Sequence, residues 1–164
     1  MQVRGIGKLG VFAIALSISG CDRREPVLSE QEIALLRETY PTMIEECIER
    51  ARYEGFDGQA FPTDMCFEME DERRWSGLWV NAFEGSRFCP QPAQTCPHDF
   101  GNEIWLSFAT DRPDSVEAYG DDAVYAIEFR GRKTRYAGNF GHLDSAAQEI
   151  IVDRVISIEE LEAN

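Results

Sequence analysis

The stretch AVYAIEFR, residues 123 to 130, decides the fold class of this 164-residue chain. Large apolar side chains occupy every second position near its centre, at Tyr125, Ile127 and Phe129. A period of two residues places these three side chains on one face of a β-strand and the intervening Ala, Glu and Arg side chains on the other face. We therefore predict a half-buried strand here.

Segments of the same character recur after residue 74. They are rich in aromatic and β-branched residues, and clusters of Gly, Pro, Asp and Asn separate them. These further predicted strands are residues 75 to 83, 103 to 109, 134 to 136 and 149 to 158. We expect the GRK sequence at 131 to 133 to form a hairpin turn, and Asp144 to cap a short helical turn over residues 145 to 148.

Two helices are predicted ahead of the strands. Ser29 and Glu32 have the spacing of a capping box, which predicts a helix from Glu30 to about Tyr40. After Pro41, apolar residues at helical spacing predict a second helix. The apolar stripe of that helix consists of Met43, Ile44, Cys47, Ile48 and Ala51.

Two amino-terminal helices followed by short antiparallel strands predict an α+β fold. The β part is expected to be a small, partly open barrel or a strongly bent sheet, and an OB-like barrel is the favoured form. Residues 29 to 164 are enough for a domain with its own core, so we predict a single domain over this range.

The first twenty residues predict export. Arg4 and Lys8 precede an apolar run over residues 9 to 18, which is shorter than the about 20 residues that a membrane-spanning helix needs. A charged start, a short apolar middle and small residues at the end are typical of a secretory signal peptide. Residues 1 to 20 are therefore set apart from the folded domain.

The sequence ISGC, residues 18 to 21, resembles the lipobox of bacterial lipoproteins. The resemblance implies cleavage before Cys21, a thioether-linked diacylglycerol on its sulfur and an acyl chain on its amino group. Two or more acyl chains anchor a protein stably to a membrane. The implied product is a cell-envelope lipoprotein that faces the periplasm. Asp22 favours the inner membrane, and residues 21 to 28 form the expected tether.

The net charge of the mature chain limits the kinds of partner that it can bind. Without Arg4 and Lys8 the chain carries 14 Lys plus Arg against 30 Asp plus Glu, a formal net charge of −16. Such a field repels phosphate backbones, so we predict no binding to nucleic acid. A cationic envelope protein or a cell-wall component is the favoured kind of partner, although acidity also serves the solubility of an exported protein.

Four cysteines remain besides Cys21. An even number in an exported chain predicts disulfide bonds, because the compartment is oxidising. Three connectivities are open. We favour the pairs Cys47 with Cys66 and Cys89 with Cys96, because neighbours in sequence meet at the lowest entropic cost.

Cys89 and Cys96 also admit a zinc hypothesis together with His98 and His142, because thiolates and imidazoles are zinc ligands. Structural zinc sites usually have about two to four residues between paired cysteines, whereas six residues lie between Cys89 and Cys96. The C-x-x-C spacing of a redox pair does not occur. We therefore predict a disulfide here, and neither a metal nor another cofactor.

His98 and His142 are the only histidines, and each lies near a carboxylate, that of Asp99 or Asp144. A carboxylate can orient an imidazole that acts as a general base. No nucleophile motif accompanies either histidine, so we predict no catalytic residue and a role in holding loops through hydrogen bonds. If a ligand binds, these two histidines are candidate contacts, and the corner GNFGHLD, residues 138 to 144, is the favoured place for it.

The run RGRKTR, residues 130 to 135, concentrates four basic residues in six positions. It lacks the first glycine of a P-loop, so it gives no support for a phosphate-binding loop of that kind. Arg132 and Lys133 are candidate contacts for an anionic wall polymer or lipid headgroup. The alternatives are a solvated hairpin tip and internal ion pairs with the surplus carboxylates.

These features predict a non-enzymatic, membrane-tethered module of the cell envelope with a binding or structural role. One alternative is an acidic inhibitor or scavenger of cationic proteins such as lysozyme, which the net charge and the lipid anchor motivate. Another alternative is a metal-dependent or hydrolytic site at His98 and His142.

Overall fold

The computed structural model describes residues 24–57, 61–83, 85–110, 113, 116 and 123–161. The predicted signal peptide, Cys21 and the start of the predicted tether lie outside the described residues. At the other end of that tether, the amides of Val27 and Leu28 both donate to the Arg52 carbonyl, at 2.8 and 3.1 Å. Along the described ranges there is no helix long and apolar enough to cross a membrane.

Three helices precede the first strand: α1 (Glu30–Thr39), α2 (Glu45–Glu54) and α3 (Thr63–Cys66). The capping box at the start of α1 is present, because the Ser29 hydroxyl accepts from the Glu32 amide and the Glu32 carboxylate accepts from the Ser29 amide. Helix α2 ends at Gly55, whose φ of 78° suits a residue without a side chain. The short helix α3 has no counterpart in the sequence-based prediction.

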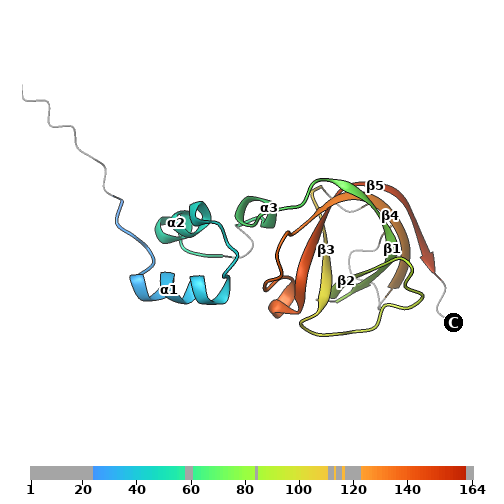
Figure 1. Ribbon diagram of the computed structural model, residues 1–164, viewed down its shortest axis with the longest axis horizontal. Coiled ribbons are helices and arrows are strands. Elements are labelled where there is room, and N and C mark those ends of the chain that lie inside the picture. The colour runs from blue at the N-terminus through green and yellow to red at the C-terminus, as the bar shows by residue number, and fades with distance from the viewer. Residues whose placement is uncertain are drawn as a thin grey trace, which may run out of the picture.

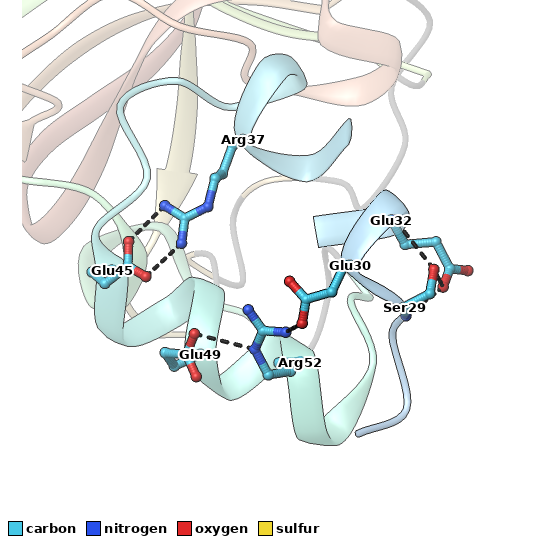
Figure 2. Close-up of polar contacts among 7 residues, drawn as sticks. All are labelled: Ser29, Glu30, Glu32, Arg37, Glu45, Glu49 and Arg52. Atoms are coloured by element: carbon cyan, nitrogen blue, oxygen red, sulfur yellow. Dashed lines mark hydrogen bonds and ion pairs between the residues drawn. The ribbon is translucent and has the colours of Figure 1, made fainter. Parts of the chain in front are cut away.

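Helices α1 and α2 pack around a small hydrophobic core that we call the helical cluster. Its buried members are Ile33, Leu36, Met43, Cys47, Ile48, Ala51, Phe61 and Cys66. Polar contacts also join the two helices (Figure 2): Arg37 donates to both carboxylate oxygens of Glu45, and Arg52 reaches Glu30 across the helix pair. Apolar burial and ion pairs therefore hold α1 against α2.

The five strands are β1 (Arg73–Ala82), β2 (Gly85–Pro90), β3 (Glu103–Phe108), β4 (Ala123–Lys133) and β5 (Ala146–Leu161). They form one sheet in the order β1-β2-β3-β5-β4, and β1 pairs with both β2 and β4, so that the sheet closes into a ring (Figure 1). We call this ring the closed sheet. The fold is therefore mixed α+β, as predicted.

The expectation of purely antiparallel strands is wrong for one pair, because β3 and β5 run parallel. A parallel pair needs a long crossover between its strands. In this chain, β4 lies between β3 and β5 in sequence and pairs antiparallel with β5.

The alternation in AVYAIEFR is confirmed. Tyr125, Ile127 and Phe129 are all buried inside the closed sheet, and Phe129 is fully inaccessible. They belong to the sheet core, whose buried members are Trp79, Phe88, Leu106, Val116, Tyr125, Ile127, Phe129, Ile150 and Val152. Ring contacts such as Phe88 with Phe129, at 5.2 Å between centroids, fill its interior.

The predicted hairpin turn at 131 to 133 is wrong. Strand β4 continues through these residues, which pair with Val152, Ile151 and Ile150 of β5. A Cβ atom on Gly131 would lie 2.5 Å from the Ile151 carbonyl oxygen. The glycine is therefore used for close approach of two backbones at a register shift in the sheet, and not for a turn.

Three other elements differ from the sequence-based prediction. Strand β2 has no counterpart in the sequence-based prediction, because the polar residues Ser86 and Arg87 interrupt its apolar pattern. The predicted strand at 134 to 136 is a single bridge between Thr134 and Met69. The predicted turn at 145 to 148 is replaced by the 3₁₀ helix η1 (His142–Asp144), directly before β5.

Both preferred disulfides are present. Cys47 in α2 is bonded to Cys66 in α3, with 5.3 Å between their Cα atoms, and both are buried. Cys89 at the end of β2 is bonded to Cys96 in the following loop, with 5.4 Å between Cα atoms. One disulfide lies inside the helical cluster and the other borders the closed sheet.

Candidate functional site

A pocket of about 370 Å³ lies where the helical segment, the described residues 24–57 and 61–67, meets the outer face of the closed sheet. This volume falls in the range of pockets that bind small molecules, about 300 to 1,000 Å³. We call it the junction pocket. Its aromatic lining consists of Tyr40, Phe56, Phe61, Phe67, Trp105 and Phe140, and its polar lining includes Thr63, Asn139, Asp144 and Glu149.

Five of the aromatic rings form a continuous series along the pocket. Phe61 lies 5.2 Å from Phe56, and Phe56 lies 5.4 Å from Tyr40, measured between ring centroids. Tyr40 lies 6.4 Å from Phe67, which contacts Phe140 edge-on at 5.0 Å. These contacts join residues from the helical segment to a loop of the closed sheet, so the pocket wall belongs to both regions.

The sixth aromatic residue, Trp105, comes from the outward face of β3. Its neighbours in sequence, Ile104 and Leu106, pack on or within the sheet core, so the strand alternation directs Trp105 away from that core. Gly141 lies against its indole, because a Cβ atom on Gly141 would be 2.5 Å from the ring carbon Cε3. With a φ of 74°, position 141 is doubly suited to glycine.

Hydrogen bonds hold the loop before β5 on two sides, to the end of α1 and to the start of β5. The Asn139 side-chain amide donates to the Thr39 carbonyl at the end of α1, at 2.9 Å. Phe140 and Ala146 exchange backbone hydrogen bonds of 2.9 and 3.0 Å. The loop that carries Phe140 and Asp144 is thereby fixed at both sides of the pocket.

Glu149 supplies a buried carboxylate to the pocket. Its relative exposure is 8%, and it lies on β5 among apolar residues. Thr63 Oγ1 donates to one carboxylate oxygen at 2.7 Å, and Ser107 Oγ donates to the other at 2.5 Å. Both donors are neutral hydroxyls. Within the described ranges, no lysine or arginine forms an ion pair with Glu149.

Asp144 adds a second carboxylate at the pocket, and it is exposed. Burial, and secondarily the negative charge of Asp144, raise the pKa of the Tyr40 phenol above its ordinary value. The Tyr40 ring therefore remains a neutral phenol at physiological pH. The charged groups of the pocket lining are both acidic.

The basic run of residues 130 to 135 is occupied by internal ion pairs. Arg132 contacts Asp153 at 2.7 Å and Asp64 at 3.2 Å, and these contacts raise the pKa of its guanidinium. Lys133 contacts Glu70 at 3.4 Å. The remaining pairs are Arg130 with Glu72 and Arg135 with Glu68. Of the interpretations of this run, internal pairing with surplus carboxylates is the one that the structure matches.

The two histidines lie in different loops. The His98 ring is paired with the Glu103 carboxylate, which also accepts from the Asp99 amide at 2.9 Å. His142 begins η1, and its carbonyl accepts from the Ser145 amide at 3.2 Å. Neither histidine lines the junction pocket.

The zinc hypothesis loses two of its ligands, because Cys89 and Cys96 are bonded to each other. In the part of the chain that the structure describes, no three side chains among His, Cys, Asp and Glu are grouped so that they could hold a metal ion. A metal centre at these positions therefore has no geometric support.

The corner at residues 138 to 144, which the sequence favours as the place for a ligand, contributes Asn139, Phe140, Gly141 and Asp144 to the junction pocket. The other lining residues were not predicted as part of a site. Two further signals were available: Glu149 is a lone carboxylate directly before the apolar run IIV, and Trp105 stands on the polar side of its strand. The contacts that join the pocket lining cross long stretches of sequence, such as the separation of 86 between Thr63 and Glu149. The chain matches no protein-family model, no curated protein and no solved structure.

Proposed function

We propose that this chain is a lipid-anchored binding protein of the bacterial cell envelope that holds a small ligand in the junction pocket. The observation that carries the proposal is the pocket itself: aromatic walls, a suitable volume and a buried carboxylate converge at one place. Apolar walls with a few placed polar groups are the usual composition of a small-molecule site.

The envelope location is supported by two independent features. The lipobox-like sequence before Cys21 gives a site for lipidation, and two disulfides suit an oxidising compartment. Mass spectrometry of protein extracted from membranes tests this directly. We expect a mature chain that begins at Cys21 with attached acyl chains, and release from the membrane in a Cys21→Ser variant. An unmodified Cys21 in membrane-extracted protein would refute the anchor.

We propose a binding role and no catalysis, because the hydroxyls near the carboxylate are already committed. The Thr63 and Ser107 side chains both donate to Glu149, and the Tyr40 phenol has a raised pKa, which disfavours its use as a nucleophile or base. These groups are suited to orient the carboxylate.

For the β part we propose an OB-like barrel. The support is its strand order, β1-β2-β3-β5-β4, with β1 paired to both β2 and β4. Five strands in a closed Greek-key arrangement are typical of that fold, which often binds ligands on an outer face of the sheet. The junction pocket uses such an outer face, through Trp105 on β3.

A thermal-shift screen of small molecules tests the proposed function. A ligand that binds the folded state at one hundred times its Kd stabilises the protein by about 2.7 kcal/mol. We expect ligands that stabilise the protein less in Phe67→Ala, which removes part of the pocket wall. For each protein, the shift in Tm is measured relative to its own Tm without ligand. Phe83→Ala is the matched control, because Phe83 is 72% exposed and does not line the pocket. Stabilisation that survives Phe67→Ala would place the ligand elsewhere.

A second candidate is the capture of cationic proteins. The observation that favours it is the internal pairing of the basic run, which leaves a large surplus of exposed acid on a chain of net charge −14. Pull-down from envelope extracts tests it, with a basic partner expected at low salt and lost at high salt. A partner retained at high salt would contradict an electrostatic capture.

A further inference from the structure

We infer that the junction pocket takes a small organic cation of the alkylammonium class, held between the Glu149 carboxylate and the aromatic walls. This inference rests on the proposed binding function and adds to it the charge and chemical class of the ligand. Three observations carry it: the environment of Glu149, the arrangement of the rings, and the volume and charge of the pocket.

The first observation is that Glu149 lacks a counter-charge within the described structure. An ionised carboxylate at 8% exposure is costly unless a cation or several hydrogen bonds compensate it. It receives two side-chain hydrogen bonds, from Thr63 and Ser107, and an ionised carboxylate has about four lone-pair sites. Acceptor capacity and negative charge therefore both remain for a ligand.

The cations on the neighbouring strand β4 are committed elsewhere. Arg132 is paired with Asp153 and Asp64, and Lys133 is paired with Glu70. Lys133 Nζ also donates to the side-chain carbonyl of Gln148, at 3.2 Å. A cation that neutralises Glu149 must therefore come from outside this pair of strands.

The second observation is the series of aromatic rings. Aromatic faces attract ammonium groups that lie within about 6 Å of a ring centroid, and a group of several rings is the usual site for quaternary ammonium compounds. In the junction pocket five rings follow one another at 5.0 to 6.4 Å between centroids. One of them, Phe61, already has the Arg50 guanidinium over its ring, at 4.4 Å from the centroid, and Arg50 is itself paired with Glu54. Trp105, the strongest type of cation–π partner, lies on the side of the sheet that carries Glu149.

The third observation is the size and charge of the pocket. A volume of about 370 Å³ lies near the lower end of the range for ligand pockets, so a compact ligand is favoured. Asp144 places a second carboxylate at the pocket, and the net charge of −14 raises the local concentration of cations around the protein. An inorganic ion would leave the aromatic walls unused.

Calorimetric titration of the full chain with choline and with its neutral isostere 3,3-dimethyl-1-butanol tests the inference. The two probes have the same shape and differ in charge. We expect choline to bind and the neutral probe to bind at least about tenfold more weakly. Equal affinity, or tighter binding of the neutral probe, overturns the cation assignment. This comparison needs no variant, so it holds even if a substitution at Glu149 affects folding.

Substitution then locates the site. Glu149→Gln keeps the shape of the side chain and removes its charge, and we expect about a tenfold or greater loss of choline affinity with little change for the neutral probe. Glu160→Gln is the matched control, because Glu160 is an exposed carboxylate on the same strand. Phe56→Leu keeps apolar volume without a ring, and a loss of about two- to fivefold is expected. Equal losses in Glu149→Gln and Glu160→Gln would indicate a general charge effect and overturn the site.

A free ammonium compound and the choline headgroup of a lipid share this chemistry, so phosphatidylcholine vesicles form a parallel arm of the test. Binding of vesicles that choline displaces assigns the headgroup, and binding of choline alone assigns a free solute. If the neutral probe binds as well as choline and Phe67→Ala weakens it, the pocket function stands and the cation inference fails. If nothing in the screen or the titration binds, both fail.

Discussion

The two hydrophobic cores of this molecule are secured in different ways. The sheet core is enclosed by five strands, and each strand is hydrogen-bonded to a neighbour along both of its edges. The helical cluster is formed by two helices of ten residues each and the four-residue α3. Isolated helices of this length are marginal in water, so the helical cluster needs additional support.

The two disulfides show the same difference. Cys47 and Cys66 are themselves buried members of the helical cluster, at 4% and 0% exposure. Cys89 and Cys96 are half-buried and join the end of β2 to a loop. The first disulfide therefore supports a core, whereas the second restrains a loop beside a core that is already enclosed. The junction pocket lies where the less supported region meets the more supported one.

The largest expected effect is in the sheet core. Phe129→Ala removes a fully buried ring that packs on Phe88, and such truncations cost about 3 to 5 kcal/mol. Chemical denaturation measures the loss, with Phe83→Ala as the control for an exposed phenylalanine. A loss of less than about 1 kcal/mol would mean that the closed sheet does not enclose the main core.

The next effect concerns the disulfide of the helical cluster. We expect Cys47→Ala with Cys66→Ala to cost about 3 kcal/mol, because the bond closes a long loop across a sequence separation of 19. Hydrogen exchange should show lost protection in α1 and α2, and protection retained in β1 to β5. Equal loss of protection in both regions would contradict the claim that this disulfide supports only the helical cluster.

The disulfide beside the closed sheet should matter less. Its sequence separation is 7, for which the chain-entropy model gives about 2 kcal/mol. Thermal unfolding of Cys89→Ala with Cys96→Ala should therefore show a smaller decrease in Tm than the Cys47 and Cys66 pair, with no change in ligand binding at the junction pocket. The reverse order of Tm values would contradict the different roles that we assign to the two bonds.

The smallest effect is expected from the ion pair between α1 and α2 (Figure 2). Hydrogen bonds from Arg37 lower the pKa of Glu45 below its ordinary value. A lowered carboxyl pKa contributes stability at neutral pH, and this contribution is lost as the pH falls through the folded-state pKa. Glu45→Gln should thus lower the Tm slightly near neutral pH, and this difference should diminish as the pH falls into the acid range.

Glu38→Gln is the matched control for this pH dependence. Glu38 lies on α1 and, among the described side chains, forms no ion pair. Its substitution should leave the Tm nearly unchanged at neutral and at acid pH. A decrease in the Tm of Glu45→Gln that persists in acid would show that the pair contributes through packing and not through charge.

The sequence predicted those features that depend on neighbouring residues. Alternation over residues 123 to 130 identified the buried face of β4, and the spacing of cysteines identified both disulfides. The parallel pairing of β3 with β5 and the use of Gly131 within a strand depend on contacts distant in sequence. Local patterns contain no information on such contacts.

The junction pocket as a whole could not be predicted for the same reason. It joins Tyr40 at the end of α1 with Trp105 on β3 and Glu149 on β5. Each of these residues is ordinary in its local context: an aromatic residue after a helix, one on a strand, and a carboxylate beside apolar residues. Only the arrangement of the helical segment against the closed sheet brings them together.

The three tryptophans allow the most direct test of the binding site. The Trp75 and Trp79 indole N–H groups donate within the closed sheet, to the Gly131 carbonyl and to the Ser86 hydroxyl. Trp105 alone among them lines the junction pocket. We predict that choline shifts the NMR resonance of the Trp105 indole N–H and leaves those of Trp75 and Trp79 in place. An unmoved Trp105 resonance at saturating choline, or a shift confined to Trp75 or Trp79, would contradict a cation site in the junction pocket.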